Sequence, residues 1–282
     1  MAREDNVLIF EDSMKLCRSK DKLREAIENS EKRQIFYVEG WNTAEDFSLP
    51  EARYEKAANV IVSKKRSYEA ASAYKGKRVA VHNFASATNP GGGVTKGSNA
   101  QEEALCRIST LYPLLSTQKI ANEFYRPHRY MKDPLHNDDC IYTPDVVVFK
   151  TDNASPVLMP EKDWYSVDVI TCAAPNLREN PSNSMNSGDG NKKATITDAE
   201  LLKMHEKRLR AILDTAVVNG AEVVILGAFG CGAFQNPPFI VAQAVRNVLP
   251  DYFKHFDTIE FAIYSSRDDS NYRTFSQKLK FR

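Results

Sequence analysis

Short apolar runs alternate with amphipathic stretches along this chain, a pattern that predicts strands connected by helices. Runs with the length of a strand, bounded by turn residues, cover 35–38, 60–62, 79–81, 167–173, 222–226 and 259–264. Residues 7–10 are one more strand candidate, and residues 140–142 and 146–149 are a predicted pair of strands. Strands that alternate with helices favour an α/β fold of three layers, in which helices flank a mixed central sheet.

The clearest predicted helix covers residues 197–219. Thr197 offers a start and Gly220 an end, and apolar side chains recur between them at helical spacing. His205 lies on that apolar stripe, so we interpret it as a packed histidine rather than a catalytic one. Further helices are predicted over 14–27, 66–75, 105–115 with a continuation to 124, 237–248, and at the C-terminus.

The most informative pattern lies between residues 77 and 115. The predicted strand 79–81 leads to Asn83 and Asn89, and three consecutive glycines follow, Gly91, Gly92 and Gly93. Three glycines in a row contribute no packing, so they indicate a ligand close to the backbone or a positive φ. In an α/β sheet, ligands bind beyond the carboxyl ends of the strands.

Three polar residues, Gln101, Glu102 and Glu103, come seven residues after the glycines, where a helical pattern begins. Ser98 is the predicted N-cap, with Gln101 completing a capping box. The two acids then lie near the positive end of the helix dipole, which favours their ionised form. The alternative interpretation is a glycine-rich turn followed by ordinary acidic residues in the first turn of a helix. Only the combination of the strand, the glycines and the two acids indicates a binding site.

A second glycine-rich loop follows the predicted strand 222–226, again at a carboxyl end. Its backbone N–H groups, next to a predicted helix start, are suited to bind the oxygens of a diphosphate. It has neither the GK[ST] of a P-loop nor the GxGxxG of a dinucleotide site. Cys231 in this loop resembles a nucleophile, but no histidine partner is evident, so a small residue in a tight loop is the favoured interpretation. The candidate residues of this loop are Gly227, Gly230, Cys231, Gly232, Ala233 and Phe234.

Composition narrows the function classes. The chain has 282 residues with 38 basic and 37 acidic side chains, so no strong net charge favours direct binding to nucleic acid or membrane. No apolar run has the length of a membrane span and no signal peptide is visible, and the five cysteines are scattered without a CxxC pair. We therefore expect a cytoplasmic protein with reduced thiols.

Two polar stretches remain. Residues 128–140 include His128, His136, Asp138, Asp139 and Cys140, but their spacing matches no usual ligand pattern, so we expect a polar loop and no metal. Residues 177–195 are rich in Ser, Asn, Gly and Lys, which predicts a mobile loop or a lid.

The motif Gly91-Gly92-Gly93, seven residues, Gln101-Glu102-Glu103 resembles the signature of poly(ADP-ribose) glycohydrolases, whose catalytic module is a macrodomain. The flanking NFASATNPGGG is similar to the bacterial branch of that family, and LGAFGCGAFQNPP at 226–238 resembles its diphosphate loop. The likeness runs from about residue 5 to the C-terminus. It implies a macrodomain core over residues 77–282, with residues 1–76 as an α/β extension packed on it.

The resemblance also implies an activity, hydrolysis of the ribose–ribose O-glycosidic bond of poly(ADP-ribose) with release of ADP-ribose from chain ends. Glu103 would be the general acid and then the base, and Glu102 would orient ribose hydroxyls. Asn83, Asn89, Gly91, Gly92, Gly93 and Gln101, together with the six candidate residues of the second loop, would bind ADP-ribose, and no cofactor is implied. There are three alternatives: a hydrolase that removes a single ADP-ribose from protein or nucleic acid, a non-catalytic ADP-ribose reader, and a site for another nucleotide.

Overall fold

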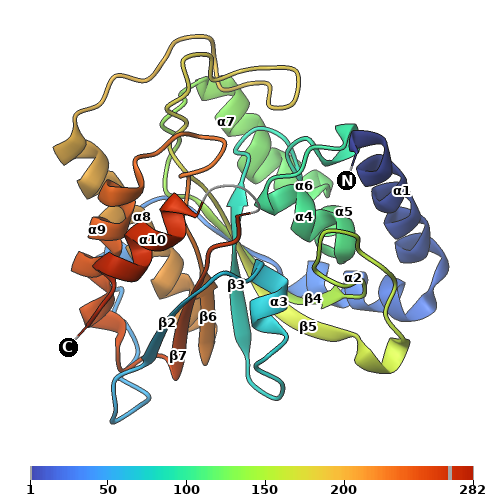
Figure 1. The fold of residues 1–282 in the computed structure, drawn as a ribbon, viewed down its shortest axis with the longest axis horizontal. Helices are drawn as coiled ribbons and strands as arrows, with labels where there is room; N and C mark the ends of the chain where they lie inside the picture. The colour runs from blue at the N-terminus through green and yellow to red at the C-terminus, as the bar shows by residue number, and fades with distance from the viewer. Residues whose placement is uncertain (1, 266–268, 282) are drawn as a thin grey trace.

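The centre of the molecule is a mixed seven-stranded sheet with strand order β1-β4-β5-β3-β6-β7-β2 (Figure 1). It is seen in a computed structural model that describes residues 2–265 and 269–281. Strands β5, β3, β6, β7 and β2 are parallel, whereas β4 is antiparallel to both β5 and β1. The strands are β1 (Ile35–Tyr37), β2 (Asn59–Ser63), β3 (Val79–Ala85), β4 (Cys140–Val148), β5 (Tyr165–Ala173), β6 (Val223–Leu226) and β7 (Thr258–Ala262).

Helices cover both faces of this sheet (Figure 1). They are α1 (Arg3–Ser19), α2 (Asp21–Arg33), α3 (Ser67–Ala71), α4 (Gln101–Ile108), α5 (Leu111–Leu115), α6 (Gln118–Ile120), α7 (Arg126–Met131), α8 (Asp198–Val218), α9 (Pro238–Val248) and α10 (Ser270–Lys278). The short 3₁₀ turns are Trp41–Thr43, Val94–Lys96, Glu161–Asp163 and Leu249–Tyr252, and Ala121–Tyr125 is a π-helical turn. The predicted three-layer α/β architecture is confirmed.

Strand β3 separates two apolar cores because its side chains point alternately to opposite faces. Val79 and Val81 belong to the core that contains apolar residues of α1 to α5, whereas Ala80 belongs to the core beneath α8, α9 and α10. Both faces are covered, so residues 79–81 of the strand are apolar without alternation, as in buried parallel sheets. The same alternation directs Asn83 towards α4, where it contacts Glu102.

Two sequence predictions near the N-terminus and the glycine loop are wrong. Residues 7–10 lie within α1 and not in a strand, since Phe10, Met14 and Cys17 of that helix are buried at helical spacing. Helix α4 begins after Ala100, which has no capping side chain, so Ser98 is not the N-cap. The Ser98 carbonyl instead accepts a hydrogen bond of 2.6 Å from the Arg107 guanidinium, which keeps this residue outside the helix.

Two further element predictions differ from the structure. Residues 140–148 form one strand, β4, because the register merely shifts between Thr143 and Val146 and then continues against β5. Pro144 and Asp145, which has a φ of 51°, occupy this bulge. The helix expected to continue to residue 124 is broken, since Thr117 begins a new helix by accepting a hydrogen bond from the N–H of Ile120.

Residues 1–76 contribute strands to the central sheet itself. They supply both edge strands, β1 and β2, and their helix α1 packs on α4, where Ser13 donates a 2.5 Å hydrogen bond to the Arg107 carbonyl. The division into an extension of residues 1–76 and a core of residues 77–282 remains an interpretation of the sequence.

Residues 174–197 connect β5 to α8 as an irregular segment that passes over the carboxyl ends of the parallel strands, at the top of the view (Figure 1). The predicted start and end of α8 are confirmed, with Thr197 as N-cap in a capping box and Gly220 at a φ of 79° just beyond the helix.

Candidate active site

A cavity of about 510 Å³ lies at the carboxyl ends of the parallel strands. The two glycine-rich loops meet there, as predicted from their positions after β3 and β6. The predicted site residues that line it are Gly92, Gly93, Gln101, Glu102, Glu103, Gly230, Gly232, Ala233 and Phe234. Asn83, Asn89, Gly91, Gly227 and Cys231 do not line the cavity in the described part of the chain and lie behind those residues or beside them.

Glu102 is buried and held at both carboxylate oxygens. Its Oε2 accepts a 2.8 Å hydrogen bond from the N–H of Ser86, and its Oε1 accepts one of 3.3 Å from the side-chain amide of Asn83. Burial and the neighbouring charge of Glu103 outweigh these bonds and raise the pKa of Glu102 well above its ordinary value. The protonated form of this carboxyl is therefore favoured more than in an exposed glutamate.

Glu103 is anchored at one oxygen only. Its Oε1 accepts a 2.9 Å hydrogen bond from the N–H of Gly93. Its Oε2 is buried and has no hydrogen-bond partner within residues 2–265 and 269–281. A buried polar atom without a partner costs about 1–3 kcal/mol, so it calls for a role at this cavity wall.

Gly92 makes room for this carboxylate. Its φ is +56°, and a Cβ at this position would lie 2.6 Å from Oε1 of Glu103. Both the backbone conformation and the space therefore require glycine, which gives the glycine-rich loop a steric reason.

Gln101 holds the start of α4 against β3. Its Oε1 accepts a 2.9 Å hydrogen bond from the N–H of Phe84, and its Nε2 donates to the His82 carbonyl at 2.7 Å and to the Ser67 hydroxyl at 3.0 Å. The predicted capping box is therefore wrong, because the amide bridges three segments and leaves the helix start uncapped.

The two asparagines of the first loop have different surroundings. Asn83 is fully buried and also donates a 3.2 Å hydrogen bond to Thr171 of β5, so it supports Glu102 from the sheet. Asn89 donates a 2.8 Å hydrogen bond to the carbonyl of Ser187, which joins the glycine loop to the irregular segment.

The second loop turns sharply at Gly230. Its φ is +75°, and a Cβ there would lie 2.7 Å from Cβ of Ala174. The side-chain amide of Asn236 closes the turn by donating to the Gly230 carbonyl at 3.1 Å, and His205 contacts Asn236 at 2.8 Å. His205 is buried, which confirms its interpretation as a packed histidine.

Cys231 and Phe234 lie in the same loop. Burial raises the pKa of the Cys231 thiol to about 12, so the reactive thiolate is scarce near neutral pH. The Phe234 ring forms part of the cavity wall, with the Arg178 guanidinium 5.4 Å from its centroid.

Several cavity residues were missed by reasoning from the sequence. Ser86 lies within the conspicuous first loop, but its amide contact to Glu102 depends on the fold. Arg178 and Asn186 belong to the polar segment, which has no periodicity to direct attention to single residues. The missed residues of the cavity wall include Arg66, Ser86, Asp152, Arg178, Met185, Asn186 and Tyr264.

The acidic and histidine-rich stretch has other contacts. Asp138 pairs with Arg208 at 2.8 Å, and His128 contacts the Phe124 carbonyl at 2.8 Å. Within residues 2–265 and 269–281, no group of three or more His, Cys, Asp or Glu side chains is arranged to hold a metal ion.

Comparison with known families identifies this arrangement. The family model of the microbial-type PARG catalytic domain, that of poly(ADP-ribose) glycohydrolase, matches residues 5–151, more than half of the chain. The chain belongs to this family. No match was found among curated protein sequences.

Solved structures of poly(ADP-ribose) glycohydrolases share the fold. The enzyme from Thermomonospora curvata is 25% identical with a TM-score of 0.84, covering 98% of this chain and 100% of that one. The enzyme from Deinococcus radiodurans, solved in complex with ADP-ribose, is 26% identical with a TM-score of 0.74, covering 90% of this chain and 96% of that one. This poly(ADP-ribose) glycohydrolase family member is a glycosidase with a macrodomain fold. Among the described residues, no helix has the length and apolar character needed to cross a membrane.

Proposed function

We propose that this poly(ADP-ribose) glycohydrolase releases ADP-ribose from polymer chain ends, with Glu103 as general acid and base. The observation that supports this assignment is the position of the Glu103 carboxylate at the cavity. Its Oε1 is anchored to Gly93, while the buried Oε2 has no protein partner among the described residues. An oxygen in that state is free to exchange a proton with a ligand.

The chemistry needs such a group. The ribose–ribose bond breaks through an oxocarbenium-like transition state, and a carboxylic acid must protonate the departing oxygen. The resulting carboxylate then takes a proton from water as its oxygen attacks the ribosyl carbon. Glu103 would serve in both steps.

Glu102 is proposed to orient the ribose hydroxyls. Its contacts with Ser86 and Asn83 fix its position, while burial and the charge of Glu103 raise its pKa. Since the two acids are adjacent, their titrations are expected to be coupled.

The remaining site residues are proposed to bind ADP-ribose. The backbone from Gly230 to Phe234 would bind the diphosphate, since turns of this kind present N–H groups to anions. Gly92 and Gly93 would approach the distal ribose. Gln101 lines the cavity and would hold the start of α4 against β3. The predicted residues that do not line the cavity, Asn83, Asn89, Gly91, Gly227 and Cys231, would hold the two loops in shape.

The preference for chain ends rests on the likeness of the first loop to the bacterial branch of the family. ADP-ribosylated protein is a second possible substrate class, because the same cavity would accept a single ADP-ribose group. A cytoplasmic location is proposed from the five free thiols, which suit a reducing compartment.

The test compares wild type, Glu103→Gln and the exposed control Glu45→Gln on purified poly(ADP-ribose). We expect ADP-ribose release by wild type and the control, and a loss of about 10²–10⁴-fold in kcat for Glu103→Gln. Calorimetry should show that Glu103→Gln still binds ADP-ribose.

Other outcomes identify the alternatives. Cleavage of singly modified protein but not of polymer would make this chain a mono-ADP-ribosyl hydrolase. Binding without release by wild type would make it a reader, and absence of binding would rule out the proposed pocket.

A further inference from the structure

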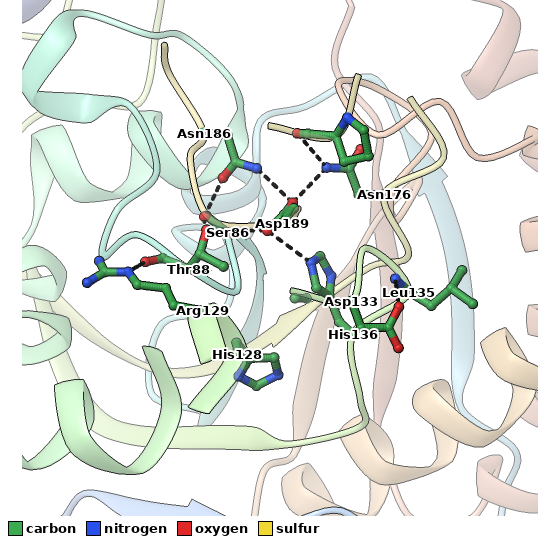
Figure 2. Close-up of polar contacts among 12 residues, drawn as sticks. Ser86, Thr88, His128, Arg129, Asp133, Leu135, His136, Asn176, Asn186 and Asp189 are labelled. Atoms are coloured by element: carbon green, nitrogen blue, oxygen red, sulfur yellow. Dashed lines mark hydrogen bonds and ion pairs between the residues drawn. The ribbon is translucent and has the colours of Figure 1, made fainter. Parts of the chain in front are cut away.

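A buried carboxylate anchors the irregular segment that crosses the site. Asp189 is 1% exposed although it belongs to no helix or strand. Its Oδ2 accepts hydrogen bonds from the side-chain amides of Asn176 at 2.7 Å and Asn186 at 2.8 Å (Figure 2). A charged group so deeply buried requires compensating partners.

The other oxygen of Asp189 faces two different elements. Oδ1 lies 3.3 Å from the Thr88 hydroxyl in the glycine loop and 3.3 Å from Nε2 of His136, close enough for a protonated imidazole to pair with it (Figure 2). Burial opposes ionisation, but His136 and the two amides outweigh it and lower the pKa of Asp189. Asp189 is therefore an ionised side chain that joins three segments.

A continuous chain of contacts leads from Asp189 to the glutamate pair. Asn186, held by Asp189, accepts a 2.6 Å hydrogen bond at Oδ1 from the Ser86 hydroxyl. The same hydroxyl accepts the N–H of Asn89 at 3.1 Å, and the main-chain N–H of Ser86 donates to Glu102 at 2.8 Å. The Ser86 hydroxyl is thus held by Asn186 of the irregular segment, and the main-chain N–H of Ser86 holds the Glu102 carboxylate.

More contacts attach the segment to the glycine loop. Asn89 donates to the Ser187 carbonyl at 2.8 Å, and Lys96 donates to the Ser184 carbonyl at 2.5 Å. Met185 and Asn186 line the cavity itself. These contacts join the segment to the glycine loop along the cavity wall.

We propose that Asp189 is a positioning residue for the glycohydrolase reaction, acting on Glu102 through Asn186 and Ser86. This inference rests on the proposed function. Asp189 touches no reacting atom; its contribution is to hold the turn whose N–H groups orient the carboxylates. An error of about 1 Å in such a group can cost about 100-fold in rate.

The substitution Asp189→Asn tests the need for a carboxylate. An asparagine has one acceptor oxygen and one amide donor at the same places. If the amide faces Asn176 and Asn186, donors face donors; if it faces the other way, it meets the Thr88 hydroxyl and His136. The first orientation loses both amide hydrogen bonds, and the second reverses the Thr88 contact and removes the negative charge that faces His136, with almost no change in volume.

The experiment measures kcat on saturating poly(ADP-ribose) for wild type, Asp189→Asn, Ser86→Ala and the double variant. Saturation is needed because Asp189 also holds Asn176, which accepts a 2.9 Å hydrogen bond from Arg178 at the cavity wall, so affinity can change too. Glu179→Gln is the matched control, since this acid lies in the same segment with its side chain 76% exposed.

We expect each single substitution to lower kcat by roughly 10–100-fold, and the double variant to lose no more than the worse single one, because both act on one chain of contacts. The pH profile should also change. The Ser86 N–H lowers the pKa of Glu102, so the limb of the kcat profile that reports Glu102 should move to higher pH in both variants. A purely structural role would leave that limb unmoved.

Three outcomes would overturn the proposal. The first is a folded Asp189→Asn variant with the kcat of wild type. The second is a double variant whose loss of kcat equals the product of the losses in the two single variants. If Asp189→Asn fails to fold, wild-type kcat in folded Ser86→Ala overturns it as well. Failure of the proposed function is separate, because wild type itself would then release no ADP-ribose.

Discussion

The carboxylate of Glu103 is joined to the main-chain N–H of Gly93 by a hydrogen bond of 2.9 Å. The neighbouring Gly92 makes this contact possible, since any Cβ there would lie 2.6 Å from the same carboxylate oxygen. The Glu103 carboxylate and the glycine loop therefore lie in direct contact, and a side chain at position 92 would displace the carboxylate.

Gly92→Ala should lower kcat by about 100-fold, because the added methyl group displaces the Glu103 carboxylate from Gly93. The matched control is Gly76→Ala, where φ is +83° but nothing lies within 4 Å of the new Cβ. Both variants should lose about 1–2 kcal/mol of unfolding free energy from the left-handed backbone. Steady-state kinetics and urea denaturation would check this, and equal kcat values for the two variants would contradict it.

Glu102→Gln should change how stability depends on pH. The raised pKa of Glu102 means that its contribution is fully present below the ordinary value of 4.5 and is lost as pH rises through the higher folded-state value. The glutamine variant escapes that loss, so its stability relative to wild type should increase between about pH 5 and about pH 8. Urea denaturation at both pH values measures the difference, with a substitution of the exposed Glu179 to Gln as the control.

Asp138→Asn should destabilise the fold by about 3–5 kcal/mol, because it leaves the buried Arg208 guanidinium without its charge partner. Arg208 and Lys207 outweigh burial and lower the pKa of Asp138, so the wild-type advantage is present above pH 3.8 and is lost as pH falls through the lower folded-state value.

Asp251→Asn is the control for this ion pair. Asp251 pairs with Arg210 at 2.7 Å, but the two side chains are 58% and 43% exposed, so its loss should cost less than about 1 kcal/mol. Thermal denaturation measures the decrease in Tm for Asp138→Asn and for Asp251→Asn. Equal decreases would contradict the prediction that the buried ion pair contributes more to stability than the exposed one.

Cys231→Ala should retain kcat within about twofold of wild type, since a thiol with a pKa of about 12 is a poor nucleophile near neutral pH. The measurement is ADP-ribose release alongside Glu103→Gln. Loss of activity in the cysteine variant with retention in the glutamate variant would instead indicate covalent catalysis by the thiol.

The sequence determined much of this protein by local rules. The apolar runs located most strands because a strand buried on both faces must be apolar throughout, and Thr197 and Gly220 marked the ends of α8. The spacing of the glycines and glutamates also pointed to Glu102 and Glu103 through its resemblance to a family signature, and both residues line the cavity. The sequence did not predict that residues 7–10 belong to helix α1, because four apolar residues in a row fit a strand as well as a helix. In the structure, burial of one face of the helix favours the helical conformation.

Only the tertiary structure decided how the site is supported. Gln101 was interpreted as a capping residue, but its amide bonds to Phe84, His82 and Ser67, partners that come together only when β3, α3 and α4 pack. Asp189 lies in a segment whose composition suggests mobility, yet it is buried among Asn176, Asn186 and His136. Local sequence specifies backbone conformation and apolar periodicity, whereas the partner of a buried polar group depends on contacts distant in the chain, which no local pattern records.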